Sequence, residues 1–199
     1  MNWAIVSILV SILSFIVAAY FYYWVSKLPT GNKKLNSIGK LIRNGSFTFL
    51  KREYTILSIF ALIVSLFIFL FFPTPIWKSE NILLNVYLVI AYILGSALSG
   101  LAGFIGISIA TIANIKTATA TKQGIEKSFM AGFRGGAVMG MAVVGTSLLG
   151  AATIYLLTGN PNIVLAFSFG ASSLALFAKA GGRYFHKNSW YCRWFNTVK

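Results

Sequence analysis

The chain has 199 residues, of which 57% are hydrophobic and only 10% are charged. A soluble globular domain carries roughly 25% charged residues, so this composition excludes one and predicts an integral membrane protein. All three acidic residues are glutamates, and the chain has one His and one Cys. These counts exclude a disulfide framework and a cysteine-based metal site, and they leave little material for acid–base chemistry.

Five segments are long and apolar enough for transmembrane helices, which need about 20 such residues. They cover residues 4–24, 54–74, 83–114, 129–157 and 163–179. The first has no basic residue before its long apolar run, so we interpret it as a retained helix and not as a signal peptide. The third belongs to an uncharged stretch too long for one simple crossing, which predicts a tilted or protruding helix. Gly159-Asn160-Pro161-Asn162 predicts a tight turn before the fifth. The sequence therefore predicts an all-α integral membrane protein with five transmembrane helices.

The basic residues predict the orientation. Sixteen of the seventeen Lys and Arg residues fall in or beside the loops 26–53 and 116–128 and the C-terminal tail, and only Lys78 falls on the opposite side. Short loops rich in Lys and Arg stay cytoplasmic. We therefore expect the N-terminus outside, with the C-terminus and both loops in the cytoplasm. The same bias accounts for most of the formal charge of +14, so we expect no nucleic-acid partner.

Small residues and one charge mark the third and fourth segments. Gly, Ala and Ser recur there at spacings that let helix backbones approach closely, which indicates a packed bundle whatever its function. Arg134 is the one ionisable residue well inside an apolar segment. Such a charge tends to face the bundle interior or an aqueous cavity, but a position near the cytoplasmic end also permits snorkelling to the interface. The sequence leaves both alternatives open.

Four sequence segments, called strings below, resemble a known family: Ile42–Tyr54, Gly95–Ala118, Phe133–Gly140 and Phe169–Ala178. In order and spacing they resemble the second to fifth helices of membrane-bound pyrophosphatases. The third string, Phe-Arg-Gly-Gly-Ala-Val-Met-Gly, matches the family almost letter for letter. On this resemblance, residues 1–182 form the first five helices of a sixteen-helix bundle.

The resemblance implies an ion pump. Members of this family hydrolyse pyrophosphate on Mg²⁺ at a cytoplasmic site, move H⁺ or Na⁺ outward and work as homodimers. For this chain the resemblance implies a prokaryotic cell membrane, with the lipid bilayer, pyrophosphate and, at full length, a second copy as partners. The family also has its N-terminus outside, as the charges predict here.

Few of the family's site residues carry over. Lys179 stands where the family has an arginine of the ion-coupling region; it keeps the positive charge but lacks the planar guanidinium fork. Lys187 falls at the position of a lysine that contacts phosphate, which makes it the candidate substrate-binding residue. The carboxylates that hold Mg²⁺ in the family are missing. We therefore expect no metal ligand and no catalytic residue in this chain.

The basic tail, residues 183–199, departs from the family. Translated one base later, the codons of residues 183–189 can encode Gly-Ile-Phe-Thr-Lys-Thr-Ala, which is the family string. We therefore hypothesise a shift of the open reading frame near codon 183. The rival interpretation is a natural five-helix paralogue with its own tail. Downstream DNA that encodes no further pyrophosphatase helices in the shifted frame would exclude the frameshift.

Three functions remain candidates. The first is a pyrophosphate-energised H⁺ or Na⁺ pump, of which this chain supplies an N-terminal part that is inactive alone. The second is a non-enzymatic membrane bundle, either truncated or accessory to another protein. The third is a small channel built on Arg134 and the glycine-rich segments, which ion flux through liposomes containing an Arg134→Ala variant would test.

Overall fold

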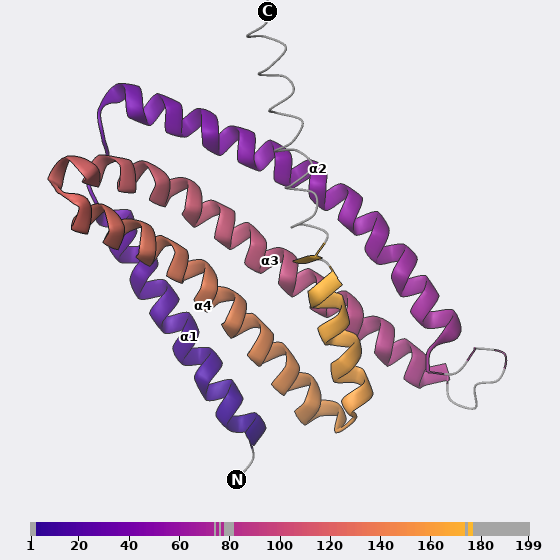
Figure 1. Cartoon of the computed structure of the whole chain (residues 1–199). Helices are drawn as coiled ribbons and strands as arrows, with labels where there is room; N and C mark the ends of the chain where they lie inside the picture. The colour runs from indigo at the N-terminus through magenta and orange to yellow at the C-terminus, as the bar shows by residue number, and fades with distance from the viewer. Residues whose placement is uncertain (1–2, 74, 76, 78–81, 174, 177–199) are drawn as a thin grey trace, which may run out of the picture.

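The computed structural model describes residues 3–73, 75, 77, 82–173 and 175–176, which form long helices joined by short turns (Figure 1). The helices are α1 (Trp3–Lys27), α2 (Lys33–Phe71), α3 (Ile82–Ala120) and α4 (Ile125–Thr158), with the 3₁₀ turn η2 (Thr121–Gln123) before α4. Residues 161–173 form a further helical segment. Within the described residues, four helices are long and apolar enough to cross a membrane. The chain is therefore an all-helical membrane protein.

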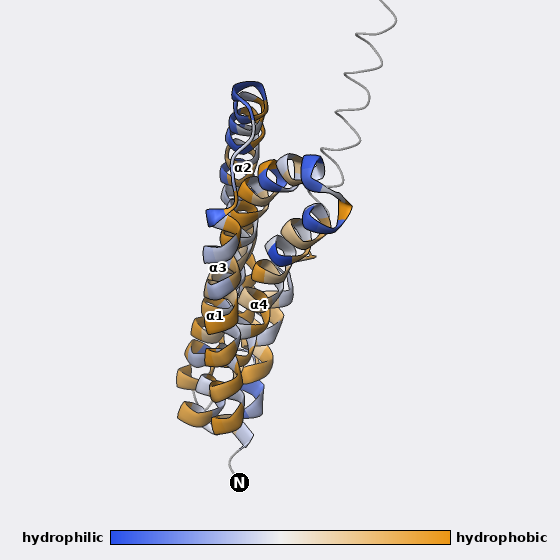
Figure 2. Ribbon diagram, turned by 90° about the vertical axis from the view of Figure 1, so that its left-hand side faces the viewer, coloured by the Kyte–Doolittle hydropathy of each residue, from blue (hydrophilic) through white to orange (hydrophobic). Residues whose placement is uncertain are grey.

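The helix α3 lies at the centre of the arrangement. It packs against α2 on one side and α4 on the other, and α1 packs chiefly against α4 (Figure 1). Large apolar side chains cover much of the outer surface, as expected for a bundle surrounded by lipid. Figure 2 shows hydrophobic residues along α1 and α4 and hydrophilic residues at the far end of α2.

Two helices extend well beyond one membrane crossing. α2 and α3 have 39 residues each, which is about 58 Å at 1.5 Å per residue, against about 30 Å for the hydrocarbon core. The prediction that residues 26–53 and 116–128 are loops is wrong over most of both segments, since α2 begins at Lys33, α3 continues to Ala120 and α4 already begins at Ile125. Lys and Arg end an apolar run, but they are good helix formers. Their appearance therefore marks the end of a span and not the end of its helix.

The predicted turn at residues 159–162 is confirmed. Gly159 takes φ 62°, a left-handed conformation that suits glycine, and its N–H donates to the carbonyl of Tyr155 at 2.8 Å. The N–H of Asn162 then donates to the side-chain oxygen of Asn160 at 2.9 Å. This turn sends the 161–173 segment back along α3.

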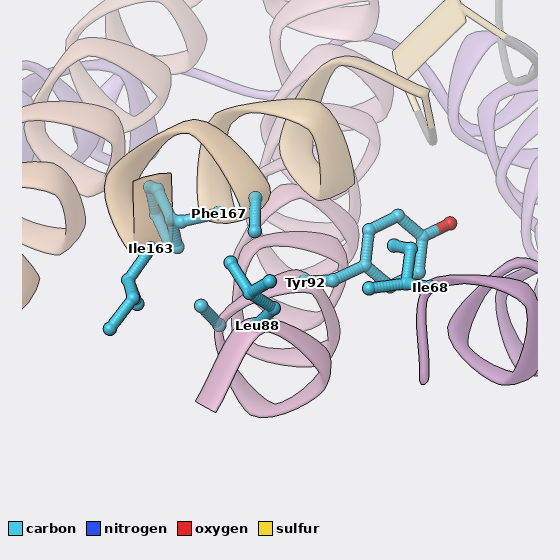
Figure 3. Packing of buried hydrophobic residues seen from close by; sticks show 7 residues of the cluster. Ile68, Leu88, Tyr92, Ile163 and Phe167 are labelled. Carbon is cyan, nitrogen blue, oxygen red and sulfur yellow. The ribbon is translucent and has the colours of Figure 1, made fainter. Parts of the chain in front are cut away.

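A buried apolar cluster joins α2, α3 and the 161–173 segment (Figure 3). The side chains labelled in the figure are Ile68, Leu88, Tyr92, Ile163 and Phe167. Tyr92 is completely buried, and its ring centroid lies 5.9 Å from that of Phe169. A second cluster, around Val25 and Ile109, joins α1, α3 and α4.

Next to the first cluster, backbone touches backbone. A β-carbon on Gly95 would overlap the carbonyl oxygen of Phe167, and one on Gly170 would overlap that of Tyr92. The hydroxyl of Ser96 donates to the carbonyl of Gly170 at 3.2 Å. We call this contact between α3 and the 161–173 segment the glycine interface. It is the close approach that the recurring small residues predict.

Candidate functional site

Within the described part of the chain, several charged side chains surround a cavity where α1 ends and α4 begins. This cavity has a volume of about 380 Å³. Its polar lining residues are Lys116, Gln123, Glu126, Lys127 and Arg134. Trp24, Leu28, Pro29, Ala120 and Met130 complete the wall. We call it the basic cavity, because three cations face one carboxylate there.

Arg134 lies at the inner side of the basic cavity and is half-buried. Its guanidinium carbon lies 3.9 Å from the ring centroid of Trp24 and 5.9 Å from that of Phe21, both on α1. A guanidinium over an aromatic face is attracted by the ring quadrupole, which contributes about 0.5–2 kcal/mol. Arg134 thus lies against α1 and lines the basic cavity.

Lys116 is the second cation, and it is only 8% exposed. Its amine donates to the carbonyl of Ser26 at 3.2 Å and to that of Leu28. The last carbonyls of a helix lack partners within the helix, so Lys116 satisfies groups at the end of α1 and ties that end to α3. The burial of Lys116 was not predicted from the sequence, where this residue was counted among the basic residues of the 116–128 loop. Its burial could have been predicted from its spacing along the helix, because Lys116 lies on the same face as Ile109, Ala113 and Ala120, which are all buried.

Glu53 is another polar residue that sequence analysis did not single out. One of its carboxylate oxygens is buried and has no hydrogen-bond partner among the described residues. Its neighbour Tyr54 donates through its hydroxyl to the carbonyl of Gly100 at 2.6 Å. A buried polar atom without a partner is uncommon in folded proteins. Glu53 could have been singled out by its position in the Ile42–Tyr54 string, where the resembling family has Gln or Glu.

A larger cavity of about 540 Å³ lies between α3, α4 and the segment that follows the 159–162 turn. Its lining is small and mostly apolar, and its polar groups are the hydroxyls of Tyr54, Ser99, Thr146, Ser147 and Ser172. These groups can donate and accept hydrogen bonds, but they do not form an acid–base pair.

Two of the predicted site residues lie outside the described residues. They are Lys179 and Lys187, together with the whole 183–199 tail. Among the residues that the structure does describe, no three His, Cys, Asp or Glu side chains are grouped so that they could hold a metal ion. The described residues therefore do not fit the Mg²⁺ site that the resemblance implies.

Comparison with known proteins identifies the relatives of this chain. The profile of the inorganic H⁺ pyrophosphatase family matches residues 12–189. The chain is 39% identical over 181 residues to the K(+)-insensitive pyrophosphate-energized proton pump of Methanosarcina mazei, covering 90% of this chain and 25% of that protein. It is 35% identical over 187 residues to the putative K(+)-stimulated pyrophosphate-energized sodium pump of Clostridium tetani, covering 94% of this chain and 26% of that protein. The chain thus spans about a quarter of the length of these relatives.

Proposed function

Because the chain belongs to the inorganic H⁺ pyrophosphatase family, we propose that it forms the first five helices of a pyrophosphate-energised H⁺ or Na⁺ pump. The observation that carries the proposal is the continuous match over residues 12–189, to relatives named as proton pumps and sodium pumps. The same strings build the glycine interface and place Arg134 beside α1. The helical packing and the family match thus involve the same residues.

The proposed orientation has the N-terminus outside and the C-terminus in the cytoplasm. The end of α1, the end of α3 and the start of α4 meet at one end of the bundle, since Lys116 contacts the carbonyl of Leu28 there and both Lys116 and Lys127 line the basic cavity. The basic N-terminal half of α2 starts from the same end. Gathering of Lys and Arg on one side is the pattern of a cytoplasmic face.

We propose that catalysis needs residues beyond those of this chain. Pyrophosphate hydrolysis on Mg²⁺ requires oxygen ligands such as carboxylates, and the chain has three acidic residues in all. In the complete assembly, Lys179 would supply positive charge to the ion-coupling region and Lys187 would contact a phosphate group. The working unit would be a homodimer in a prokaryotic cell membrane, and the 199-residue chain alone would be inactive.

A chimera tests the proposal. Residues 1–182 would replace the matching segment of the Methanosarcina mazei pump, and inverted vesicles would be assayed for pyrophosphate hydrolysis and H⁺ uptake. We expect both activities in the chimera and neither in the 199-residue chain alone. The intact relative is the positive control.

Two results would contradict the proposal. A chimera that inserts in normal amounts but neither hydrolyses nor transports would favour a non-enzymatic membrane bundle. Mg²⁺-dependent phosphate release by the purified chain alone would overturn its expected inactivity.

A further inference from the structure

We propose that the basic cavity binds a phosphate group at the membrane surface, carried by an anionic lipid or free in solution. The proposal rests on the contacts around the cavity and does not depend on pump activity. It names a binding site for a ligand class that differs from the Mg²⁺–pyrophosphate chemistry of the proposed function.

The charges of the cavity are not neutralised by the described residues. Arg134 contacts the rings of Trp24 and Phe21, and neither Arg134 nor Lys127 forms an ion pair or a side-chain hydrogen bond within the described part of the chain. A half-buried charge without a counter-charge is costly. Glu126 also lines the cavity, but it lies in the first turn of α4, where a carboxylate is stabilised by the helix dipole.

The geometry suits a phosphate group. The guanidinium of Arg134 lies over the ring of Trp24, with its carbon 3.9 Å from the ring centroid. A guanidinium carries its N–H donors in its own plane, where they can bind phosphate oxygens in pairs. Lys127 and Arg134 are seven residues apart on α4 and so project from the same side of that helix. Lys116 uses two of its three N–H donors on carbonyls, which leaves one for a ligand.

The wall of the cavity also suits a lipid. Leu28 and Met130 place apolar side chains beside the cations, as needed for the glycerol and upper acyl carbons of a lipid. Trp24 lies near the end of α1, at the level where tryptophans favour a membrane interface. Basic pockets between transmembrane helices are a recurrent form of anionic headgroup site.

Native mass spectrometry of the purified 199-residue chain would test the proposal, with phosphatidylglycerol as the probe and phosphatidylcholine as the neutral comparison. We expect Lys127→Gln/Arg134→Gln to raise the dissociation constant of the first phosphatidylglycerol by at least about fivefold. This is the effect expected if only one of the two removed cations contributes to binding. The matched control, Lys34→Gln/Lys122→Gln, removes the same charge from exposed positions outside the cavity. It should change that constant by less than about twofold. Equal losses in both double variants would overturn the proposal.

Three further variants and one competition experiment keep the test independent of folding. Lys127→Gln alone changes an exposed side chain and should still weaken binding, and Arg134→Lys should retain most of it. Glu126→Gln removes the only carboxylate among the lining residues and should strengthen binding, an effect that a purely structural role does not produce.

Displacement of phosphatidylglycerol by excess inorganic phosphate would identify free phosphate as the source, and resistance to it would identify the lipid. Unchanged binding in all cavity variants would contradict the proposal.

Discussion

Two regions of the bundle hold helices together by opposite means. At the glycine interface, Gly95 and Gly170 each bring a backbone into direct contact with a carbonyl of the facing helix. At the basic cavity, the long side chains of Lys116 and Arg134 reach across from α3 and α4 to α1. The first region depends on the absence of side-chain atoms, and the second depends on their length and charge.

This difference separates a rigid contact from an adaptable one. Backbones in contact leave no space for a ligand and transmit any added volume directly to the neighbouring helix. Cationic side chains can change rotamer and retain free donors, so they can hold helices together and still accept an anion. The two regions should therefore respond differently to changes of similar size.

The largest effect is expected at Gly95. Gly95→Ala adds a methyl group that overlaps the backbone of Phe167, and such overpacking costs about 3 kcal/mol where the backbone must move. The free energy of unfolding would be measured by SDS titration of the chain in mixed micelles.

Gly136→Ala is the matched control, because nothing lies within 4 Å of the added carbon. It should be neutral or stabilise by up to about 1 kcal/mol, the gain in helix propensity from glycine to alanine. Equal effects of the two substitutions would show that the glycine interface is not a close contact in the membrane protein.

The next effect is expected at Lys116. Lys116→Met keeps the length of the side chain but leaves the carbonyls of Ser26 and Leu28 without their donor, at a cost of about 2 kcal/mol. The end of α1 should then open more often, so trypsin should cut after Lys27 faster than in the parent chain.

Lys122→Met provides the control for this prediction, because Lys122 is exposed and its side chain forms no hydrogen bond or ion pair with the described residues. Lys116→Arg should protect the end of α1 nearly as well as lysine, since it keeps both charge and donors. Unchanged cleavage in Lys116→Met would mean that the end of α1 is fixed by packing alone.

Hydropathy alone was sufficient to predict that the helices exist. An apolar run must satisfy its backbone internally in lipid, so α1, α3 and α4 each contain one of the predicted spans, and α2 covers the 54–74 span up to Phe71. Helix ends were harder to predict, because the N-terminal half of α2 is basic yet continues the same helix. Outside the lipid, the end of a helix depends on capping and packing, which hydropathy does not report.

The candidate site could be predicted only in part. Arg134 was evident because a charge inside an apolar segment is rare. Its neighbour Trp24 lies on α1, far away in sequence, and local spacing carries no information about such pairs. Lys116 was missed because hydropathy assigns every lysine to solvent, whereas its position among Ile109, Ala113 and Ala120 decides its burial.

A smaller effect is expected from the contact between Arg134 and Trp24. A double-mutant cycle with Arg134→Gln and Trp24→Leu should give a coupling energy of about 1 kcal/mol, because the partly buried stack is shielded from water. The exposed pair Lys27 and Tyr23, with 4.2 Å between the amine and the ring centroid, is the control and should couple by about 0.5 kcal/mol. A coupling near zero for Arg134 would mean that the cation is held by its surroundings and not by the ring.

The smallest effect is expected at Ser96, and it tests whether the glycine interface depends on shape alone. Ser96→Ala removes the hydrogen bond to the carbonyl of Gly170 without adding volume, so the backbone contact should survive. Hydrogen bonds between helices in membranes contribute about 0.6 kcal/mol on average, which is well below the expected cost of Gly95→Ala. Ser99→Ala is the control, since Ser99 lines the neighbouring cavity and its hydroxyl forms no hydrogen bond with the described residues. If Ser96→Ala destabilised the chain as much as Gly95→Ala, hydrogen bonding and not close backbone packing would hold the 161–173 segment against α3.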